Sequence, residues 1–201
     1  MQDEAPATTL DVNQRIAQRV RDLRTARGDS LEALATRCGV SRSMISLVER
    51  GESSPTATVL DKLAAGLGVP LATLFSGTPT PDAPPSPVAR AADQSVWTDP
   101  ASGYVRRALT PPGCDGATQL VEVTLPGRTS VAFEHVPRAA RVTQQVWVLD
   151  GRIDVTVGVT THALRAGDCL AMDLDGPTSF SNPKRKAARY LVVVTTEPRR
   201  S

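Results

Sequence analysis

The 201-residue sequence predicts two domains, an all-α domain of five helices followed by an all-β domain. In the first part of the chain, apolar residues recur three and four positions apart, which is the period of an amphipathic helix. Later they alternate, or form short Val- and Leu-rich runs between Gly and Pro, which is typical of a sandwich or barrel. The segment 77–87 separates the two patterns and holds five prolines, which favour an extended chain. We therefore expect a helical domain over 12–76, a linker over 77–94 and a β domain over 95–198.

Composition excludes several classes of protein. No run of about 18 apolar residues is present, so a membrane span is not expected. The first ten residues lack the basic and apolar regions of a signal peptide. Cys38, Cys114 and Cys169 form no CxxC pair and their number is odd, which argues against a disulfide framework or a zinc site. A cytoplasmic protein with no membrane partner is the expectation.

Charge is distributed unevenly although the formal net charge is only +2. Between positions 13 and 51 eight Arg stand against four acidic residues, a local excess of four positive charges. Such an excess favours binding to the phosphates of DNA, although charge runs of this kind are also common on solvated helix faces.

The helical half divides at its glycines and prolines. Ile16, Val20 and Leu23 lie at i, i+4 and i+7 and form the apolar stripe of a first helix. Gly39 provides a left-handed turn between two short helices. The five predicted helices cover about 13–27, a segment ending at Cys38, 41–49, a segment opened by Ser54-Pro55, and 71–75.

Two short helices joined by a tight glycine turn are typical of a helix-turn-helix, whose second helix enters the major groove. At about 100° per residue, Ile45 and Val48 point inward from the segment 41–49. Its opposite face carries polar groups suited to base edges; on geometry alone, an ordinary surface helix is the alternative. The residues of that face are Arg42, Ser43, Ser46 and Leu47.

The stretch 40–69 closely resembles the phage-repressor-like (Cro/C1, or XRE) helix-turn-helix family. It matches the pattern S-x-S-x-I-S-x-[IVL]-E-x-G-x-x-x-P-[ST], followed by L-x-x-[IL]-A-x-x-L-x-V. The resemblance covers about 16–75 and implies a five-helix, lambda-repressor-like domain in which Glu49 pairs with Arg24. It also implies DNA contacts to base edges, to phosphates at helix N-termini, and to the backbone from the loop side. In that order, the implied residues are Arg42, Ser43, Ser46 and Leu47, then Ser30 and Ser41, then Arg50 and Thr56.

Short β-rich runs with turns between them follow position 95. Asp150-Gly151 is a two-residue hairpin signal between two of these runs, and 166–168 marks another turn. The predicted strands cover 104–109, 120–125, 145–149, 152–157, 169–172 and 190–195.

The glycines of this half, with Asn182, resemble the cupin family over roughly 95–198, which implies an RmlC-like jelly-roll barrel. The first cupin motif aligns with Gly127 and Gly151, and the second with Gly167 and Asn182. The four metal-ligand positions of the family then hold Phe133, His135, Gln144 and Thr178. A catalytic metal needs about three good protein ligands, so no metal, cofactor or catalytic residue is expected.

The same positions suit a small-molecule pocket, with polar groups on an apolar wall. Arg106 or Arg107 could offer a charge to a carboxylate, and Arg107 is the residue we select. The complete set of predicted ligand-binding residues is Arg107, Phe133, His135, Gln144, Val146, Thr178 and Phe180.

Together, the two resemblances imply an XRE-family regulator with a cupin sensor domain. The expected partners are double-stranded DNA with a palindromic operator, a small-molecule effector and a second copy of the chain. Two alternatives stay open. One is a metal-dependent cupin enzyme with a DNA-binding head, and the other is a repressor without effector that uses the barrel only to dimerise.

Overall fold

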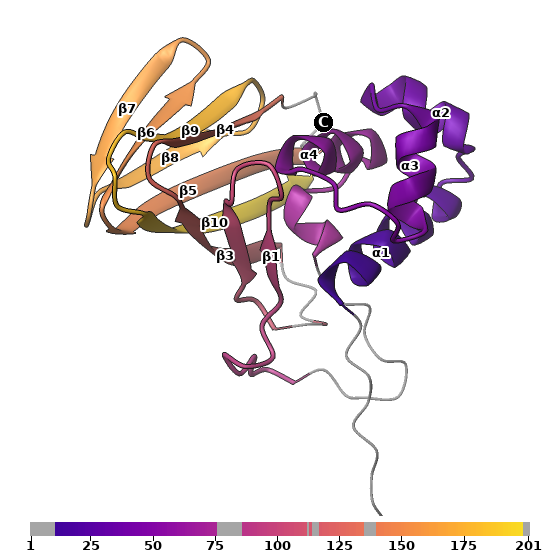
Figure 1. Ribbon diagram of the computed structural model, residues 1–201, viewed down its shortest axis with the longest axis horizontal. Coiled ribbons are helices and arrows are strands. Elements are labelled where there is room, and N and C mark those ends of the chain that lie inside the picture. The colour runs from indigo at the N-terminus through magenta and orange to yellow at the C-terminus, as the bar shows by residue number, and fades with distance from the viewer. Residues whose placement is uncertain (1–10, 76–85, 112, 114–116, 135–139, 199–201) are drawn as a thin grey trace, which may run out of the picture.

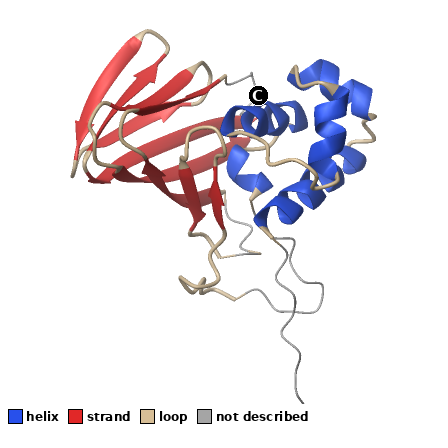
Figure 2. Ribbon diagram, in the orientation of Figure 1, coloured by secondary structure: helices blue, strands red, loops and turns tan. Residues whose placement is uncertain are grey.

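The computed structural model describes residues 11–75, 86–111, 113, 117–134 and 140–198. Helices occupy the first of these ranges and strands the later ones (Figures 1 and 2). Most of the predicted linker's Pro-rich part, 77–85, lies outside the described residues, as does His135. Within the described ranges, no helix has the length and apolar composition that crossing a bilayer requires.

Four α-helices and one 3-10 helix form the N-terminal domain as described, so the prediction of five α-helices is corrected at its last member. The segment 71–74 is a 3-10 helix, because its amides bond three residues back: Phe75 N–H donates to the Ala72 carbonyl at 3.1 Å. The helices are α1 (Val12–Ala26), α2 (Leu31–Cys38), α3 (Arg42–Glu49), α4 (Ala57–Leu67) and η1 (Leu71–Leu74).

Serine and threonine side chains cap the N-termini of three of these helices. Ser30 and Ser41 accept hydrogen bonds from the third amide of α2 and α3, at 3.1 and 3.2 Å. The prediction that Ser54-Pro55 opens the fourth helix is wrong by two residues, because Thr56 caps α4 and accepts from the Val59 amide at 3.4 Å. Gly39 adopts the predicted left-handed conformation, with φ at 65°.

The C-terminal domain consists of two separate antiparallel sheets, so it is a sandwich and not the closed barrel that was predicted. One sheet has the strand order β1-β2-β3-β10-β5-β8 and the other β4-β9-β6-β7. Most connections carry the chain from one sheet to the other. The strands are β1 (Val96–Thr98), β2 (Val105–Ala108), β3 (Thr118–Leu125), β4 (Thr129–Phe133), β5 (Ala140–Asp150), β6 (Arg152–Val157), β7 (Thr160–Arg165), β8 (Cys169–Asp173), β9 (Thr178–Asn182) and β10 (Ala188–Pro198).

The turn at Asp150-Gly151 does not close a hairpin, which corrects the sequence prediction. It joins β5 and β6, which belong to different sheets and are not paired. Gly151 has φ at 83°, and a Cβ at this position would lie 3.0 Å from the Ala188 side chain. The glycine therefore serves a crossing between sheets where the backbone passes close to β10.

The helical domain packs against one end of the sandwich, with α4 between the sheets and the two helices α2 and α3 (Figure 1). Thr58 on α4 donates to the Ala132 carbonyl of β4 at 3.3 Å, and Lys62 forms an ion pair with Glu134 at 3.1 Å. The ring of Phe75, at the end of the helical domain, lies 5.4 Å from the ring of Trp97 on β1. The two domains therefore share a buried core across this interface.

Candidate functional sites

The predicted recognition helix, α3, is held in place by its inner face. The side chains of Ile45 and Val48 are fully buried, as the helical periodicity predicts, on a helix that packs against α1 and α2. Burying two such aliphatic side chains contributes roughly 3–6 kcal/mol by area. The opposite face of α3 is thereby held toward solvent.

That exposed face starts with Arg42, which forms no hydrogen bond or ion pair with any described residue and is free to meet a base edge. Ser43 is exposed, and Ser46 and Leu47 are half-buried. Arg50, just after the helix, binds the Glu52 carboxylate through Nε and Nη2, both at 2.8 Å. A phosphate contact by Arg50 therefore requires exchange of this exposed ion pair.

A two-pronged ion pair ties α3 to α1. Arg24 donates from Nε and Nη2 to the two Glu49 oxygens at 2.6 and 2.8 Å, which confirms the predicted pairing. The hydrogen bond with Glu49 raises the pKa of Arg24. The Glu49 side chain is only 6% exposed, so this ion pair holds α3 against α1.

The capping residues predicted to meet phosphates lie at exposed or half-exposed helix ends. Ser30 and Ser41 are exposed at the N-termini of α2 and α3, where helix dipoles favour an anion. Beside Ser30, hydrogen bonds from Arg37 lower the pKa of the Asp29 carboxyl to about 2. Thr56 is half-buried as the cap of α4.

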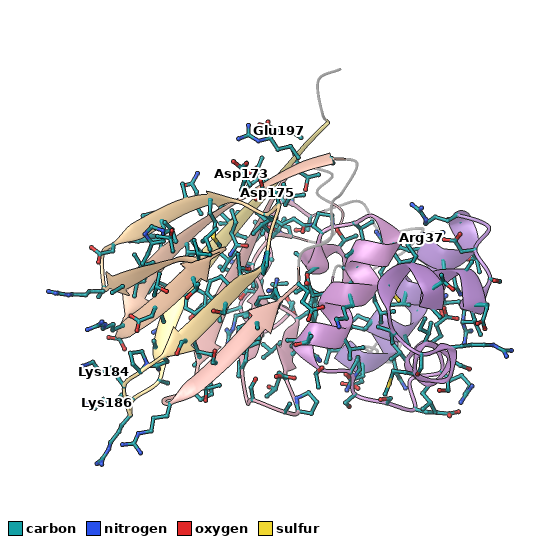
Figure 3. The ribbon with its side chains drawn as sticks, turned by 90° about the horizontal axis from the view of Figure 1, so that it is seen from above. Arg37, Asp173, Asp175, Lys184, Lys186 and Glu197 are labelled. Atoms are coloured by element: carbon teal, nitrogen blue, oxygen red, sulfur yellow. The ribbon has the colours of Figure 1, made fainter. Side chains whose placement is uncertain are left out.

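Lys184 and Lys186 do not belong to the arginine-rich surface of the N-terminal domain. Figure 3 places Lys184 and Lys186 at the end of the sandwich away from the helices, whereas Arg37 lies on the helical domain. The basic surface of the N-terminal domain is therefore separate from the basic turn that precedes β10.

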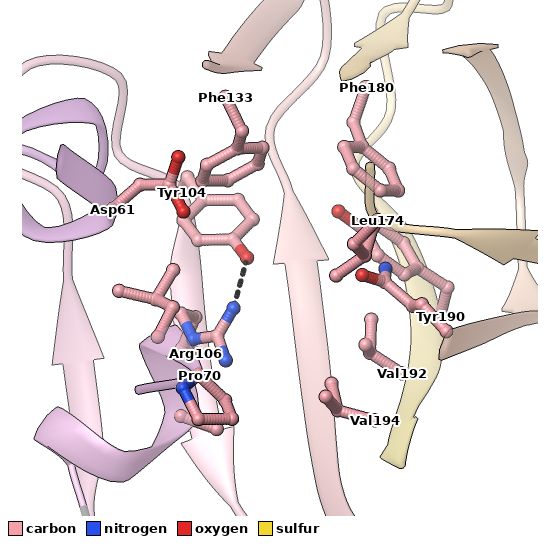
Figure 4. Close-up of a pocket in the computed structure, with 13 residues that line it drawn as sticks. Asp61, Pro70, Tyr104, Arg106, Phe133, Leu174, Phe180, Tyr190, Val192 and Val194 are labelled. Carbon is pink, nitrogen blue, oxygen red and sulfur yellow. Dashed lines mark hydrogen bonds between the residues drawn. The ribbon is translucent and has the colours of Figure 1, made fainter. Parts of the chain in front are cut away.

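A cavity of about 40 Å³ lies between the two domains, and we call it the interdomain cavity. One water needs roughly 10–15 Å³ when volume is counted in this way, so the cavity has room for a molecule of a few heavy atoms. Asp61 on α4 and the segment 70–72 form one wall, and the inner faces of both sheets form the others (Figure 4). Apolar and aromatic side chains dominate the sheet side: Tyr104, Phe133, Leu174, Phe180, Tyr190, Val192 and Val194.

Besides the two tyrosine hydroxyls, Arg106 and Gln144 bring polar groups to this cavity from the sheets. Arg106 is 7% exposed, and its Nη1 donates to the Tyr104 hydroxyl at 3.1 Å. Its guanidinium carbon lies 5.2 Å from the centre of the Phe75 ring, which belongs to the helical domain. Gln144 is 8% exposed, and its side-chain amide forms no hydrogen bond with a described residue.

Tyr190 closes the aromatic side of the cavity. Its ring is stacked on Phe180, with centres 5.7 Å apart and planes 2° from parallel. Burial raises the pKa of the Tyr190 hydroxyl well above its ordinary value, and the nearby Tyr104 hydroxyl acts in the same direction. The Tyr190 hydroxyl is therefore neutral at physiological pH.

The cavity brings together three of the seven predicted ligand-binding residues: Phe133, Gln144 and Phe180. Val146 and Thr178 are buried but do not line it. Arg107 does not line it either, because side chains alternate along β2 and its neighbour Arg106 takes the inward position. His135 lies outside the described residues.

Sequence reasoning missed Asp61, Tyr104 and Tyr190. A period-two pattern starting from Tyr104 would have selected Arg106 over Arg107. Asp61 is 1% exposed and shares a helix face with Ala57 and Ala64, so a charge in an apolar stripe was the available signal.

The donor groups at the cupin metal positions do not fit a catalytic metal. Phe133 offers no donor atom, and Gln144 and Thr178 offer a neutral amide and a hydroxyl. Within the described ranges, no three His, Cys, Asp or Glu side chains are grouped as a metal ion needs.

Comparison with known proteins identifies the family of this chain. A family model described as HTH_3, helix-turn-helix, matches residues 20–74. The HTH-type transcriptional regulator SutR of Escherichia coli (strain K12) is 31% identical over 171 residues, covering 85% of this chain and 89% of that protein.

A solved structure aligns with most of the chain. An HTH_3 family transcriptional regulator from Vibrio cholerae superposes with a TM-score of 0.71 at 28% identity, over 92% of this chain and 96% of that one. The cupin domain of an XRE family transcriptional regulator from Enterobacter cloacae aligns with 46% of this chain and 95% of its own length, at 15% identity and a TM-score of 0.42. From the motif of α3, the family model and the full-length relative, the chain belongs to the XRE-type family of HTH-type transcriptional regulators.

Proposed function

We propose that this chain is a non-enzymatic transcription regulator whose affinity for operator DNA changes when a small molecule occupies the interdomain cavity. The observation that supports this proposal is the composition of the cavity wall. Asp61, Pro70 and Leu71 come from the helical domain, and Arg106 and Gln144 come from the sandwich. A ligand that contacts both domains binds with different free energies to two arrangements of these domains. Such a difference is what couples ligand binding to DNA binding.

Few contacts separate the interdomain cavity from the helices that are predicted to bind DNA. The cavity residue Asp61 lies on α4, whose N-terminal cap Thr56 is itself a predicted DNA contact. α4 also packs against α2, which precedes the recognition helix. A small displacement of α4 would therefore change how α3 is presented to the major groove.

The sandwich is proposed to be a cupin-type sensor without a catalytic metal. The side chains at the family's metal positions supply too few metal donors, as described above. The mixed wall of the cavity suits a ligand with one polar end and an apolar body. Because the target is DNA, we place the action of the protein in the cytoplasm.

A homodimer is proposed to bind a palindromic operator. Supporting this, the outer face of the six-stranded sheet exposes Trp147 by 48%, Val96 by 41% and Leu120 by 37%. Strand alternation directs these side chains away from the cavity and toward solvent. A second copy at this face would present two recognition helices to half-sites about one helical turn, or a multiple of it, apart.

Arg42→Ala tests the assignment of the recognition helix. An operator is first selected from random duplexes with the wild-type chain, and affinity is then measured by fluorescence anisotropy at a fixed salt concentration of about 0.15 M. Loss of one base-edge contact is expected to weaken operator binding about 10- to 100-fold, with a smaller effect on a scrambled duplex.

Arg165→Ala is the matched control, because it removes an exposed arginine from β7 in the other domain. It is expected to leave operator affinity within about twofold. Equal affinities of the Arg42 variant and the wild type for the operator would refute the assignment of α3 to base readout.

A further inference from the structure

Arg106 is a cation buried at the wall of the interdomain cavity. Its side chain is 7% exposed, and no carboxylate of the described residues forms an ion pair with it. Its Nε has no hydrogen-bond partner, and its only hydrogen bond to described residues runs from Nη1 to Tyr104. An unpaired buried charge is costly, so the site favours a ligand that supplies the opposite charge.

The unused edge of this guanidinium has the geometry that binds carboxylates elsewhere in the same chain. Arg24 and Arg50 each bind a glutamate through Nε and Nη2. Arg106 uses neither atom in a hydrogen bond to a described residue. Figure 4 shows its guanidinium directed from β2 toward the wall that holds Leu174 and Tyr190. A small rotation of the side chain would present this edge to a carboxylate in the cavity.

Two neutral donors can complete the binding of an anion. The Tyr104 oxygen accepts a bond from Arg106, so its own proton can be donated to another acceptor. The Gln144 amide lines the same cavity, and none of its donors is used by a described residue. Both are neutral, so among the described residues that line the cavity the positive charge comes from Arg106.

The rest of the wall restricts the anion to one charge and a small apolar body. Val192, Val194 and Phe180 offer only apolar contact. Asp61 adds a carboxylate to the opposite wall, so a doubly charged phosphate would meet more repulsion than a carboxylate. The volume of about 40 Å³ limits the ligand to a few heavy atoms.

Arg106 also connects the site to the helical domain. It lies over Phe75, at the end of η1, while Tyr104 and the strand that carries it belong to the sandwich. An anion that draws the guanidinium toward the cavity weakens its contact with the Phe75 ring. Occupancy of the site is therefore linked to the packing of the helical domain on the sandwich.

We propose that the interdomain cavity binds a small aliphatic monocarboxylate, held by Arg106 with help from Tyr104 and Gln144, and that its binding acts on the DNA-binding domain through Phe75. This inference rests on the proposed function, because it names the class of ligand and the first contact of its regulation.

Matched ligands test the class of molecule. Propionate, isobutyrate and valerate are compared with their primary amides and with inorganic phosphate by thermal unfolding and calorimetry of the full chain, at constant ionic strength. A carboxylate at about ten times its Kd is expected to raise Tm by about 2–5 °C, while amides and phosphate leave Tm unchanged. Carboxylates that shift Tm no more than their amides overturn the proposal.

Variants test whether Arg106 binds the carboxylate. Arg106→Gln is expected to abolish the carboxylate-dependent shift, and Arg107→Gln, on the outward face of the same strand, to keep it. Because Arg106→Gln removes a buried hydrogen bond and could unfold the chain, Tyr104→Phe is the second variant. It keeps the cation and is expected to weaken carboxylate binding about tenfold. A folded Arg106→Gln chain with the full shift, or Tyr104→Phe with unchanged affinity, contradicts the assignment.

Operator titrations separate this inference from the function on which it rests. Isobutyrate is expected to change the operator Kd of the wild type at least fivefold, and this change is expected to be lost in Phe75→Leu while the Tm shift remains. A carboxylate that binds without changing operator affinity contradicts the proposed regulation but leaves the ligand class standing. A neutral molecule that changes operator affinity from this cavity, where carboxylates do not, contradicts the ligand class alone.

Discussion

At the scale of single residues, Glu49 shows how one buried carboxylate positions the predicted DNA-reading surface. It lies at the last position of α3 and bonds both oxygens to Arg24 of α1, and its backbone carbonyl accepts from Arg21 at 2.9 Å. The side chains of Glu49 and Arg24 are 6% and 15% exposed. Water therefore replaces little of this contact when one partner is removed.

Glu49→Gln is expected to destabilise the chain by about 2–3 kcal/mol, because it leaves the Arg24 guanidinium in a poorly solvated site without its counter-charge. Urea unfolding of the full chain measures the change. Glu52→Gln is the control, since its ion pair with Arg50 is exposed and is expected to contribute less than about 1 kcal/mol. Equal losses in the two variants would show that the buried pair contributes no more than a surface pair.

Residues were predicted correctly where helix periodicity, capping or a family pattern fixes their place. Ser41, Ile45 and Val48 follow from helix periodicity and capping, and the Glu49–Arg24 pair follows from the family pattern. Arg106 illustrates the opposite case. Its surroundings include Phe75, 31 positions earlier in the chain, and no local pattern in the sequence records that contact.

At the scale of elements, most helix boundaries were predictable and the assignment of strands to sheets was not. Helices form hydrogen bonds within one segment, so Gly39 and the serine caps mark their ends. Strands need distant partners. β4 and β9 pair with each other across 45 positions or more, and their predicted motif residues gave ligand positions but no strand. The turn at Gly151 has the composition of a hairpin, and only the close approach of Ala188 reveals a sheet crossing.

The N-terminus of helix α4 is also stabilised by a residue that is distant in sequence. Besides Thr56, the carboxylate of Asp99 from the sandwich accepts from the Ala57 amide at 3.2 Å. Asp99 is 4% exposed and also accepts from amides of its own loop, including Ser102 at 3.2 Å. A negative charge at a helix N-terminus is favourable, so the second domain stabilises an element of the first.

Asp99→Ala is therefore expected to destabilise the chain by about 2 kcal/mol and to speed hydrogen exchange at the first amides of α4. Mass spectrometry of a peptide covering 56–67 reports the exchange. Asp93→Ala removes an exposed acid from the preceding turn and should change neither quantity. Unchanged exchange in α4, together with lower overall stability, would limit Asp99 to ordering its own loop.

At the scale of the whole molecule, the two proposed binding functions of the sandwich fall on the two faces of one sheet. Its inner face carries Arg106, Tyr190 and Gln144 toward the interdomain cavity. Its outer face carries Trp147, directly opposite Leu191 on β10 and Cys169 on β8. A ligand on one face and a second copy of the chain on the other can thus bind the same sheet without competing for area.

Trp147→Ser tests the proposed dimer face. Light scattering with size exclusion is expected to give the wild type twice the 21.3 kDa chain mass, and the variant a concentration-dependent fall toward one chain. The reason is the loss of a large, half-exposed aromatic side chain, the type of residue that contributes most at protein interfaces. Val159→Ser is the control, because Val159 is fully exposed at the β6–β7 turn of the other sheet. A monomeric wild type, or a Trp147→Ser chain that dimerises equally well, would place operator recognition on a single chain or assign dimerisation to another surface.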